Sequence, residues 1–409
     1  MAGTEAGTDA GQAGQAGRVL IVLASAQRRG AEVEGSQLAA QLVAVGVDAR
    51  VVALHPGGGA AAGKSAAAGR SAAAEQLLDA PVLGERPLSW ATLRGLRREA
   101  ASTDVVIAYG SSALPACALA LTGCRTPFVY RSIGDPGRWL RGRLHRWRTA
   151  RLFRRAAHVV ALWPAAAEAI VRLHGVPAAS VSTIPNARPM PAGAPGGAAD
   201  TGAGDGADAA HGRARARAAL EVPDDALVVA WVGALSAEKR PLAAVRAVAA
   251  LGPPAAGFPP AWLVLAGAGA LAAEVEAECE RLLPGRHRLL GVVQLPPVWA
   301  AADLVLLTSA TEGMPGVLIE AALHRVPAVA TDVGAVASIV TDGAGGRLVP
   351  AAAGPAELAA AIREVAGRAR TMGDFAAAHV AARFTWQVVV PQWQQMLGEV
   401  AARRGNPGR

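Results

Sequence analysis

Cysteine is scarce in this chain, and the few copies present are not arranged as a metal site or a disulfide framework. The three cysteines among 409 residues are Cys117, Cys124 and Cys279, and their spacing matches neither kind of pattern. Long hydrophobic runs are also missing, because no uninterrupted apolar stretch reaches the roughly 18 residues that a membrane-spanning helix requires. The sequence therefore predicts a reduced, cytoplasmic protein rather than a disulfide-stabilised one.

The amino-terminal residues lack the basic and then apolar segments of a secretion signal. Their composition predicts a disordered tail over residues 1–17. The whole chain carries a formal net charge of +8 and has a pI of about 10.5. Such a charge favours an acidic partner without choosing among a nucleotide, a membrane surface and nucleic acid.

Acidic residues are absent between Asp135 and Glu168, where arginines instead accumulate from Arg138 to Arg155. Apolar residues interleave with the arginines at helical spacing, so the segment predicts an amphipathic basic helix. Such a helix can pack by its apolar side, or it can lie on the anionic inner face of a membrane. No recognised nucleic-acid module accompanies it, and we expect no nucleic-acid partner.

One stretch, residues 308–331, organises the rest of the chain together with the strand that leads into it. Residues 303–308 form a short apolar run that predicts a buried strand. Gly313 and Gly316 enclose a Met-Pro turn, and a helical pattern follows. In a parallel sheet this turn lies at the carboxyl edge, where open α/β folds bind ligands. The helix amides and dipole point into the turn, so the stretch predicts a phosphate site.

Two carboxylates flank this predicted phosphate site. Glu312 stands on the turn and Glu320 stands eight positions later, about one turn into the helix. Both can face one cavity, which suggests one carboxylate for the hydroxyls of a sugar and one for a ribose. The alternative is that Glu312 is an ordinary loop residue and Glu320 a solvated helix residue.

The run EGMPGVLIEAALHRVPAVATDVGAV, residues 312–336, resembles the E-x7-E region of retaining, nucleotide-sugar-dependent glycosyltransferases of family 4. Other stretches are similar to elements of the same family. They are GALSAEKR (233–240), resembling G-R-L-x-x-x-K-G; IPN (184–186), resembling I-P-N-G; HRLLGVVQ (287–294), resembling the nucleobase-contacting F-x-G-x-V; and FTW (384–386), resembling F-S/T-W. The resemblance extends from residue 18 to about residue 402.

The resemblance implies the GT-B architecture, an α/β fold with two facing Rossmann-like doubly wound domains and an interdomain cleft. The alternating strand and helix patterns of both halves agree with this fold. The expected division is a disordered tail (1–17), an N-terminal Rossmann-like acceptor domain (18–188), a flexible linker or insertion (189–215), a C-terminal Rossmann-like nucleotide-sugar-binding domain (216–383) and a C-terminal helix that crosses back to the first domain (384–409).

The resemblance also implies roles for individual residues. Glu312 and Lys239 are the expected catalytic residues; Glu320, Gly313, Gly316, Val317, Leu318, Val293 and Gly233 are expected to bind the donor; Arg28, Gly30, Arg131 and Asp135 are expected to bind the acceptor. Ala234 stands where the family has an arginine. Because a hydrogen bond to a charged group contributes about 1.5–3 kcal/mol, this departure weakens the expected leaving-group stabilisation. Arg240 is a hypothetical substitute.

The implied reaction is transfer of a sugar from a nucleotide diphosphate sugar to an acceptor hydroxyl, with retention of anomeric configuration. We expect a UDP- or GDP-sugar rather than an ADP- or dTDP-sugar. The expected acceptor is a glycan, a lipid-linked molecule or a small molecule. The sequence contains no Asp-x-Asp pair, so a metal-bridged diphosphate is not expected. We expect neither a metal site nor a cofactor.

Three alternatives stay open. A pseudoenzyme that binds sugar nucleotides without transfer would account for Ala234. A nucleotide-sugar epimerase or phosphorylase could use the same architecture. A P-loop nucleotide hydrolase is suggested by the stretch from Gly58 to Ser65, which satisfies G-x4-G-K-[ST] and would give Lys64 the central role.

Overall fold

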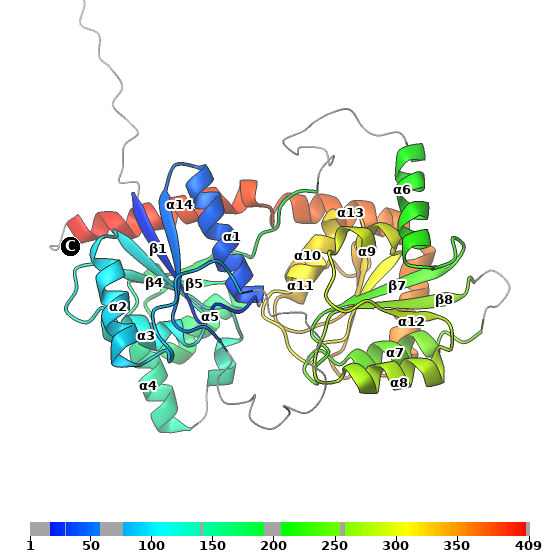
Figure 1. The fold of residues 1–409 in the computed structure, drawn as a ribbon, viewed down its shortest axis with the longest axis horizontal. Coiled ribbons are helices and arrows are strands. Elements are labelled where there is room, and N and C mark those ends of the chain that lie inside the picture. Colours follow the sequence, from blue (N-terminus) through cyan, green and yellow to red (C-terminus); the bar gives the residue numbers. More distant parts are fainter. Residues whose placement is uncertain are drawn as a thin grey trace, which may run out of the picture. The chain divides into compact units, whose positions relative to one another are not determined.

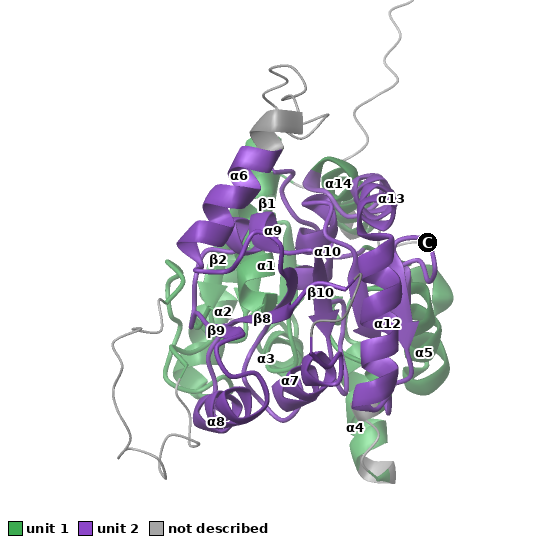
Figure 2. Ribbon diagram, turned by 90° about the vertical axis from the view of Figure 1, so that its right-hand side faces the viewer, with its two compact units in different colours: residues 1–184, 387–409 green, residues 185–386 purple. Residues whose placement is uncertain are grey.

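The computed structural model describes residues 17–28, 30–57, 77–139, 142–191, 206–253 and 258–405. The chain divides into two compact units, shown in Figure 2. Unit 1 comprises residues 1–184 and 387–409, and unit 2 comprises residues 185–386. The expected tail up to residue 16 and the P-loop-like stretch at 58–65 lie outside the described residues.

Unit 1 is built on a six-stranded parallel sheet with the order β2-β1-β3-β4-β5-β6. The central strands β1 and β3 are buried on both faces, apart from exposed Arg18 at the start of β1, as parallel strands between helical layers must be. The strand order reverses between β1 and β3, which places a ligand-binding switch point there. The strands are β1 (Arg18–Leu23), β2 (Asp48–Ala53), β3 (Val105–Tyr109), β4 (Phe128–Arg131), β5 (His158–Ala161) and β6 (Val181–Thr183).

Helices cover this sheet, with α1 on one side and α2 and α3 on the other (Figure 1). The unit 1 helices are α1 (Gly30–Ala44), α2 (Trp90–Ala101), α3 (Ala113–Ala120), η2 (Pro136–Trp139), α4 (Arg143–Phe153), α5 (Pro164–His174), η3 (Ala178–Ser180) and α14 (Trp386–Gly405), of which all but the first residue of α14 belong to unit 1. Helix α1 begins at Gly30, one of the predicted acceptor residues, and Glu32 and Glu34 near its start are buried.

Unit 2 has a second six-stranded parallel sheet with the order β12-β11-β10-β7-β8-β9. Relative to its own first strand, this is the Rossmann order, with the switch point between β7 and β10. The strands are β7 (Leu227–Val232), β8 (Ala261–Ala266), β9 (His287–Leu289), β10 (Leu304–Leu307), β11 (Ala328–Thr331) and β12 (Gly346–Val349). Two doubly wound, Rossmann-like parallel sheets were predicted, and the structure confirms them.

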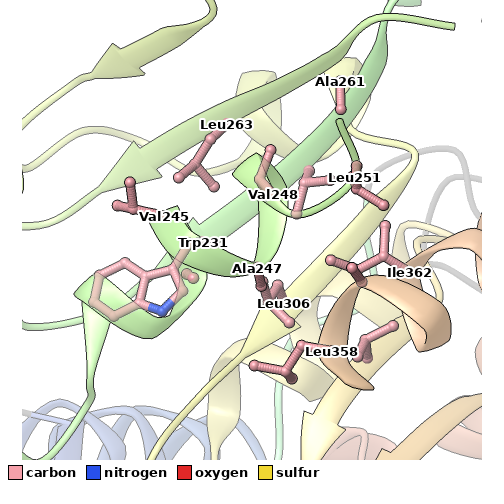
Figure 3. Close-up of a cluster of buried hydrophobic side chains, with 14 of the residues drawn as sticks. Trp231, Val245, Ala247, Val248, Leu251, Ala261, Leu263, Leu306, Leu358 and Ile362 are labelled. Carbon is pink, nitrogen blue, oxygen red and sulfur yellow. The ribbon is translucent and has the colours of Figure 1, made fainter. Parts of the chain in front are cut away.

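The helices of unit 2 enclose its sheet, with α7, α8 and α12 on one side and α9 and α10 on the other (Figure 1). The side chains between the first layer and the sheet form a buried apolar cluster that includes Trp231, Leu263 and Ile362 (Figure 3). The unit 2 helices are α6 (Gly206–Ala219), α7 (Pro241–Ala249), α8 (Ala272–Leu282), α9 (Pro296–Ala301), α10 (Gly316–Leu323), α11 (Val336–Ile339), α12 (Pro355–Gly367) and α13 (Ala369–Ala381).

Helix α6 corrects the predicted linker, because residues 206–215 of the expected flexible segment are helical. The Arg217 side chain, 2% exposed, fastens this helix to the sheet. It donates to Asp303 at 2.8 Å and to the carbonyl oxygen of Ala301 at 3.1 Å. The carboxylate of Asp303 also accepts from the backbone amide of Val228 at 2.7 Å. One carboxylate, 18% exposed, thus joins α6 to the entries of β7 and β10.

Within the described residues, no helix has both the length and the apolar character needed to cross a membrane.

Candidate functional site

The switch point of unit 2 brings together two loops that the sequence predicted to bind phosphate. The turn after β7 contains Gly233 and Lys239, and the loop after β10 contains Glu312. Adjacent parallel strands end at the same edge of a sheet, so β7 and β10 deliver both loops to one place. Residues separated by more than seventy positions in the sequence therefore meet.

Lys239 and Glu312 form the centre of this site. The Nζ atom of Lys239 lies 2.7 and 2.8 Å from the two carboxylate oxygens of Glu312. The Oγ atom of Ser309 donates to the same carboxylate at 2.6 Å. The Glu312 side chain is 7% exposed and that of Lys239 is 29% exposed. The carboxylate is therefore fixed from two sides, while the ammonium group keeps a solvent-facing side for a ligand.

Hydrogen bonds between the two loops hold this pair in place. Thr308 donates from Oγ1 to the carbonyl oxygens of Lys239 and Arg240 at 3.0 and 2.9 Å. Trp231 donates from its indole nitrogen to Thr308 Oγ1 at 3.1 Å. The amide of Ala310 donates to the carbonyl oxygen of Glu238 at 2.8 Å. The lysine turn and the glutamate loop therefore form one braced element rather than two independent loops.

A glycine supports the Glu312 loop from behind. Gly334 has a φ of +60°, and a Cβ atom there would lie 2.2 Å from the carbonyl oxygen of Glu312. The neighbouring amide of Ala335 donates to Gly313 at 2.8 Å. This close backbone contact fixes the position of the Glu312 loop relative to the segment that follows β11.

Replacing Gly334 with alanine is therefore expected to destabilise unit 2 by about 1–3 kcal/mol, because the new side chain must adopt a left-handed backbone and displace the Glu312 loop. Urea unfolding measures the loss. Gly343→Ala is the matched control, since Gly343 has a φ of +74° and open space around its Cα. Equal losses in both variants would show that backbone strain alone is responsible and that the loop contact contributes nothing.

Glu320, the second predicted carboxylate, is engaged by a residue that the sequence did not single out. The Nε atom of Arg188 lies 2.5 Å from Glu320 Oε1. The same guanidinium lies over the first turn of α10, where a Cβ on Gly316 would be 1.7 Å from Arg188 Nη2. Arg188 and Glu320 are 132 positions apart, and no spacing rule links them. In the sequence, Arg188 is marked only by its position two residues after the IPN element.

The other predicted donor-binding residues differ in how far they are exposed to a ligand. Gly313 and Val317 are half-buried at the site. Leu318 is 1% exposed, and its amide donates to Pro315 at 3.2 Å, so its side chain belongs to the core. The amide of Gly233 donates to Ala266 at 3.0 Å. Val293 is 39% exposed beyond β9, where it can meet a ligand.

Arg240 does not occupy the place of the missing arginine. Its Nη1 atom donates to the carbonyl oxygen of Ala351 at 2.5 Å, and its backbone is left-handed, with a φ of +52°. The guanidinium is therefore already bound on the far side of the turn. Ala234 is exposed, so an arginine side chain at this position would start from the surface of the unit and not from its core.

The predicted acceptor residues lie at or beyond the ends of strands in unit 1, and Arg131, the last residue of β4, does not fit its role. Arg28, Gly30 and Asp135 are exposed. Arg131 is 0% exposed, donates to the carbonyl oxygen of Ile184 and lies 5.4 Å from the ring of Trp393. Burial lowers the pKa of its guanidinium. Arg131 therefore anchors α14 to the sheet, and it offers no surface to an acceptor.

A cavity of about 600 Å³ lies at the carboxyl edge of the unit 1 sheet. The turn after β3 contributes Ser111 and Ser112, and the segment before α2 contributes Arg86 and Leu88. Its position beside the switch point of this sheet is typical of ligand sites in α/β folds. Sequence analysis missed it because these residues belong to no recognised pattern.

The predicted basic helix exists in part as α4. Trp147 is 55% exposed and Arg151 stacks over its ring at 5.2 Å, whereas Phe153 is buried. Residues 140 and 141 lie outside the described part of the chain. The helix therefore has an exposed aromatic and arginine face, and its contact with a membrane stays a prediction.

Two family profiles match this chain, and each of them matches mainly one of the two units. The profile described as Glycosyltransferase Family 4 matches residues 28–188, and the profile described as Glycosyl transferases group 1 matches residues 226–367. The D-inositol 3-phosphate glycosyltransferase of Mycobacterium bovis is 34% identical over 216 residues, which are 48% of this chain and 43% of that protein. An exopolysaccharide phosphotransferase of Streptomyces coelicolor is 37% identical over 132 residues, 30% of this chain and 13% of that protein. The chain thus spans less than half the length of these relatives.

Solved structures share the fold over nearly the whole chain. HepE of Anabaena, crystallised with UDP and glucose, has a TM-score of 0.72 at 22% identity and covers 93% of this chain and 99% of its own. Sucrose-phosphate synthase of Thermosynechococcus elongatus has a TM-score of 0.68 at 18% identity and covers 94% and 99%. These likenesses show the fold. With two parallel sheets, a lysine–glutamate pair at the second switch point and a family profile on each unit, the chain belongs to glycosyltransferase family 4, with the GT-B fold.

Proposed function

We propose that this protein is a retaining, metal-independent glycosyltransferase that moves a sugar from a nucleotide diphosphate sugar to an acceptor hydroxyl. The observation that carries the proposal is the Lys239–Glu312 pair at the switch point of unit 2. The pair places a cation and a carboxylate side by side, next to the first turn of α10. A sugar diphosphate needs this combination, because its anionic and hydroxyl-rich parts are joined at the bond that breaks.

In the proposed reaction the bond between the anomeric carbon and the phosphate oxygen breaks, and negative charge grows on the departing diphosphate. Lys239 and the first amides of α10 stabilise that charge. Glu312 accepts hydrogen bonds from the donor sugar, and Glu320 accepts them from the ribose. The acceptor oxygen attacks on the face that the phosphate leaves, and its proton passes to the departing phosphate oxygen.

The cavity beside Ser111 and Ser112 supports an acceptor site in unit 1. Its serine hydroxyls and the nearby Arg86 can hold polar groups, while Leu88 and Pro87 supply an apolar wall. We propose that the acceptor is a hydroxyl-bearing molecule with an apolar part, which includes lipid-linked acceptors. Exposed Trp147 on α4 favours docking of the protein at an anionic membrane surface.

The first test is thermal stabilisation by UDP, GDP, ADP and dTDP, with and without Mg²⁺, for the wild type and Glu320→Ala. We expect one diphosphate to stabilise the wild type without metal. At 100 times its Kd the gain should be about 2.7 kcal/mol. The corresponding sugar nucleotide should then release diphosphate, and NMR of the product should show the donor's anomeric configuration. An inverted product, or stabilisation only by adenine nucleotides with Mg²⁺, would contradict the proposal.

A pseudoenzyme is the second candidate, and Ala234 is the observation that favours it. A protein without the family arginine could bind the donor and fail to stabilise the leaving group. It would show the same thermal shift and no product with any acceptor.

A further inference from the structure

We propose that Arg188 is the second phosphate-binding cation of the donor site and takes the part that the family assigns to the arginine replaced here by Ala234. The inference rests on the proposed function. When the donor binds, Arg188 exchanges partners. The guanidinium of Arg188 leaves Glu320 and binds the diphosphate, and the Glu320 carboxylate becomes available to the ribose.

Hydrogen bonds hold the segment that carries Arg188 beside the start of α10. Its amide donates to the carbonyl oxygen of Phe384 at 2.8 Å. Two residues earlier, Asn186 donates from Nδ2 to the carbonyl oxygen of Met314 at 3.1 Å. The segment therefore runs along the loop that precedes α10, and it points the guanidinium at the first turn of that helix.

The guanidinium stands where a phosphate is expected. Gly316 is the first residue of α10, and a Cβ atom there would overlap Arg188 Nη2 at 1.7 Å. The N-cap residue, Pro315, makes no side-chain hydrogen bond to this end of the helix. Glu320, one turn further along, holds the Nε atom at 2.5 Å. The arginine thus lies between the predicted ribose carboxylate and the predicted phosphate-binding amides.

Electrostatics makes this arrangement receptive to an anion. The amino end of a helix carries a partial positive charge, and a cation placed there is destabilised. Arg188 is 13% exposed, so water screens this repulsion weakly. The Glu320 carboxylate offsets part of it, and a diphosphate would neutralise both the guanidinium and the helix end. When a diphosphate binds, the Arg188–Glu320 ion pair is therefore replaced by an ion pair between Arg188 and the diphosphate, so the lost pair is compensated.

Arg240, the rival candidate for the missing arginine, donates from Nη1 to the carbonyl oxygen of Ala351 at 2.5 Å and so points away from this place. Lys239 supplies the first phosphate-binding cation of the proposed site, and Arg188 supplies the second. Arginine also suits this position because its planar fork can bind two phosphate oxygens at once. Arg188 therefore accounts for how a family member can lack the turn arginine and still hold a diphosphate.

The test measures binding of metal-free inorganic pyrophosphate, UDP, GDP, uridine and guanosine by calorimetry. For Arg188→Gln we expect Kd for pyrophosphate and the preferred diphosphate to rise about 10- to 150-fold, the range of a hydrogen bond to a charged group. Kd for the matching nucleoside should change less than about threefold, because a nucleoside has no phosphate. Arg188→Lys should recover part of the loss.

Rescue provides the sharpest readout. Adding Ala234→Arg to Arg188→Gln should restore most of the pyrophosphate affinity, because an arginine then stands at the family position. If Arg188 had only a structural role, the Ala234→Arg substitution would not restore the pyrophosphate affinity of Arg188→Gln. Arg240→Gln removes the same charge from the same unit and tests the rival arginine. Arg363→Gln, at an exposed position on α12, controls for net charge.

The outcomes separate the two proposals. If the wild type binds neither pyrophosphate nor any diphosphate, the proposed function fails. If it binds them and Arg188→Gln binds equally well, or if the loss appears in Arg240→Gln instead, the assignment of Arg188 is wrong. Circular dichroism and melting of each variant without ligand identify misfolding, and a misfolded glutamine variant is replaced by Arg188→Met in the same series.

Discussion

Replacing Lys239 with alanine is expected to reduce kcat about 100- to 1,000-fold, the loss seen when one preorganised donor to a developing negative charge is removed. The Nζ atom stands beside Glu312 at the switch point, where the departing diphosphate is proposed to lie. Because its contribution grows as the phosphate departs, kcat should fall more than KM rises. Steady-state kinetics with the sugar nucleotide identified by thermal shift measures both.

A second substitution at Glu312 controls for structural damage caused by Lys239→Ala. Removing Lys239 leaves a largely buried carboxylate with Ser309 as its neighbour. The double variant Lys239→Ala, Glu312→Gln relieves that charge, and it should regain stability without regaining turnover. If the double variant recovers turnover, or if the single variant keeps normal kcat, the lysine does not stabilise the leaving group.

The chain contains two lysines, Lys64 and Lys239, and this allows a direct test between the two nucleotide-binding hypotheses. A nucleotide in the switch-point site should protect Lys239 from acetylation and leave Lys64 reactive, as mass spectrometry can measure. The P-loop hypothesis expects the opposite. Lys64→Ala is accordingly the matched control for Lys239→Ala.

The sequence predicted the centre of the candidate site because its parts obey local rules. A buried strand, a Gly/Pro turn and a helix in that order had to end at the carboxyl edge of a sheet. The restart of the pattern at residue 227 placed Lys239 at the same edge. The place of both loops needed only strand direction, which hydrophobic runs and turns reveal, whereas the choice of Lys239 came from the resemblance of its turn to the family's G-R-L-x-x-x-K-G element.

Other features depend on contacts between distant segments and left no local signal. The pair Arg188–Glu320 joins residues 132 positions apart. Arg131 was expected to bind the acceptor, yet it is buried, where a carbonyl oxygen and an aromatic ring of the folded unit accommodate it. Helix α6 lies in a stretch without apolar periodicity, and tertiary anchoring through Arg217 rather than an apolar face holds it.

Replacing Asp303 with alanine is expected to destabilise unit 2 by about 3–5 kcal/mol, the usual loss when one partner of a buried ion pair is removed. Arg217, 2% exposed, would keep its charge without its carboxylate partner. The amide of Val228 would lose its acceptor as well. Because Asp303 joins α6 to β7 and β10, the loss should also loosen the strands that carry Lys239 and Glu312.

Denaturant unfolding followed by tryptophan fluorescence measures this loss, with Asp374→Ala as the surface control. Asp374 pairs with Arg325 at 3.5 Å, and their side chains are 51% and 66% exposed, so its removal should change stability by about 0–1 kcal/mol. Combining Asp303→Leu with Arg217→Met removes both charges, and this double variant should be more stable than Asp303→Leu alone. A loss below about 1 kcal/mol in Asp303→Ala, or a double variant no better than the single one, would mean that the buried pair does not hold α6 to the sheet. Since the ion pair lies at the amino edge of the strands and the donor site at the carboxyl edge, weaker nucleotide binding in the destabilised variant would show that the site depends on the rigidity of the whole sheet.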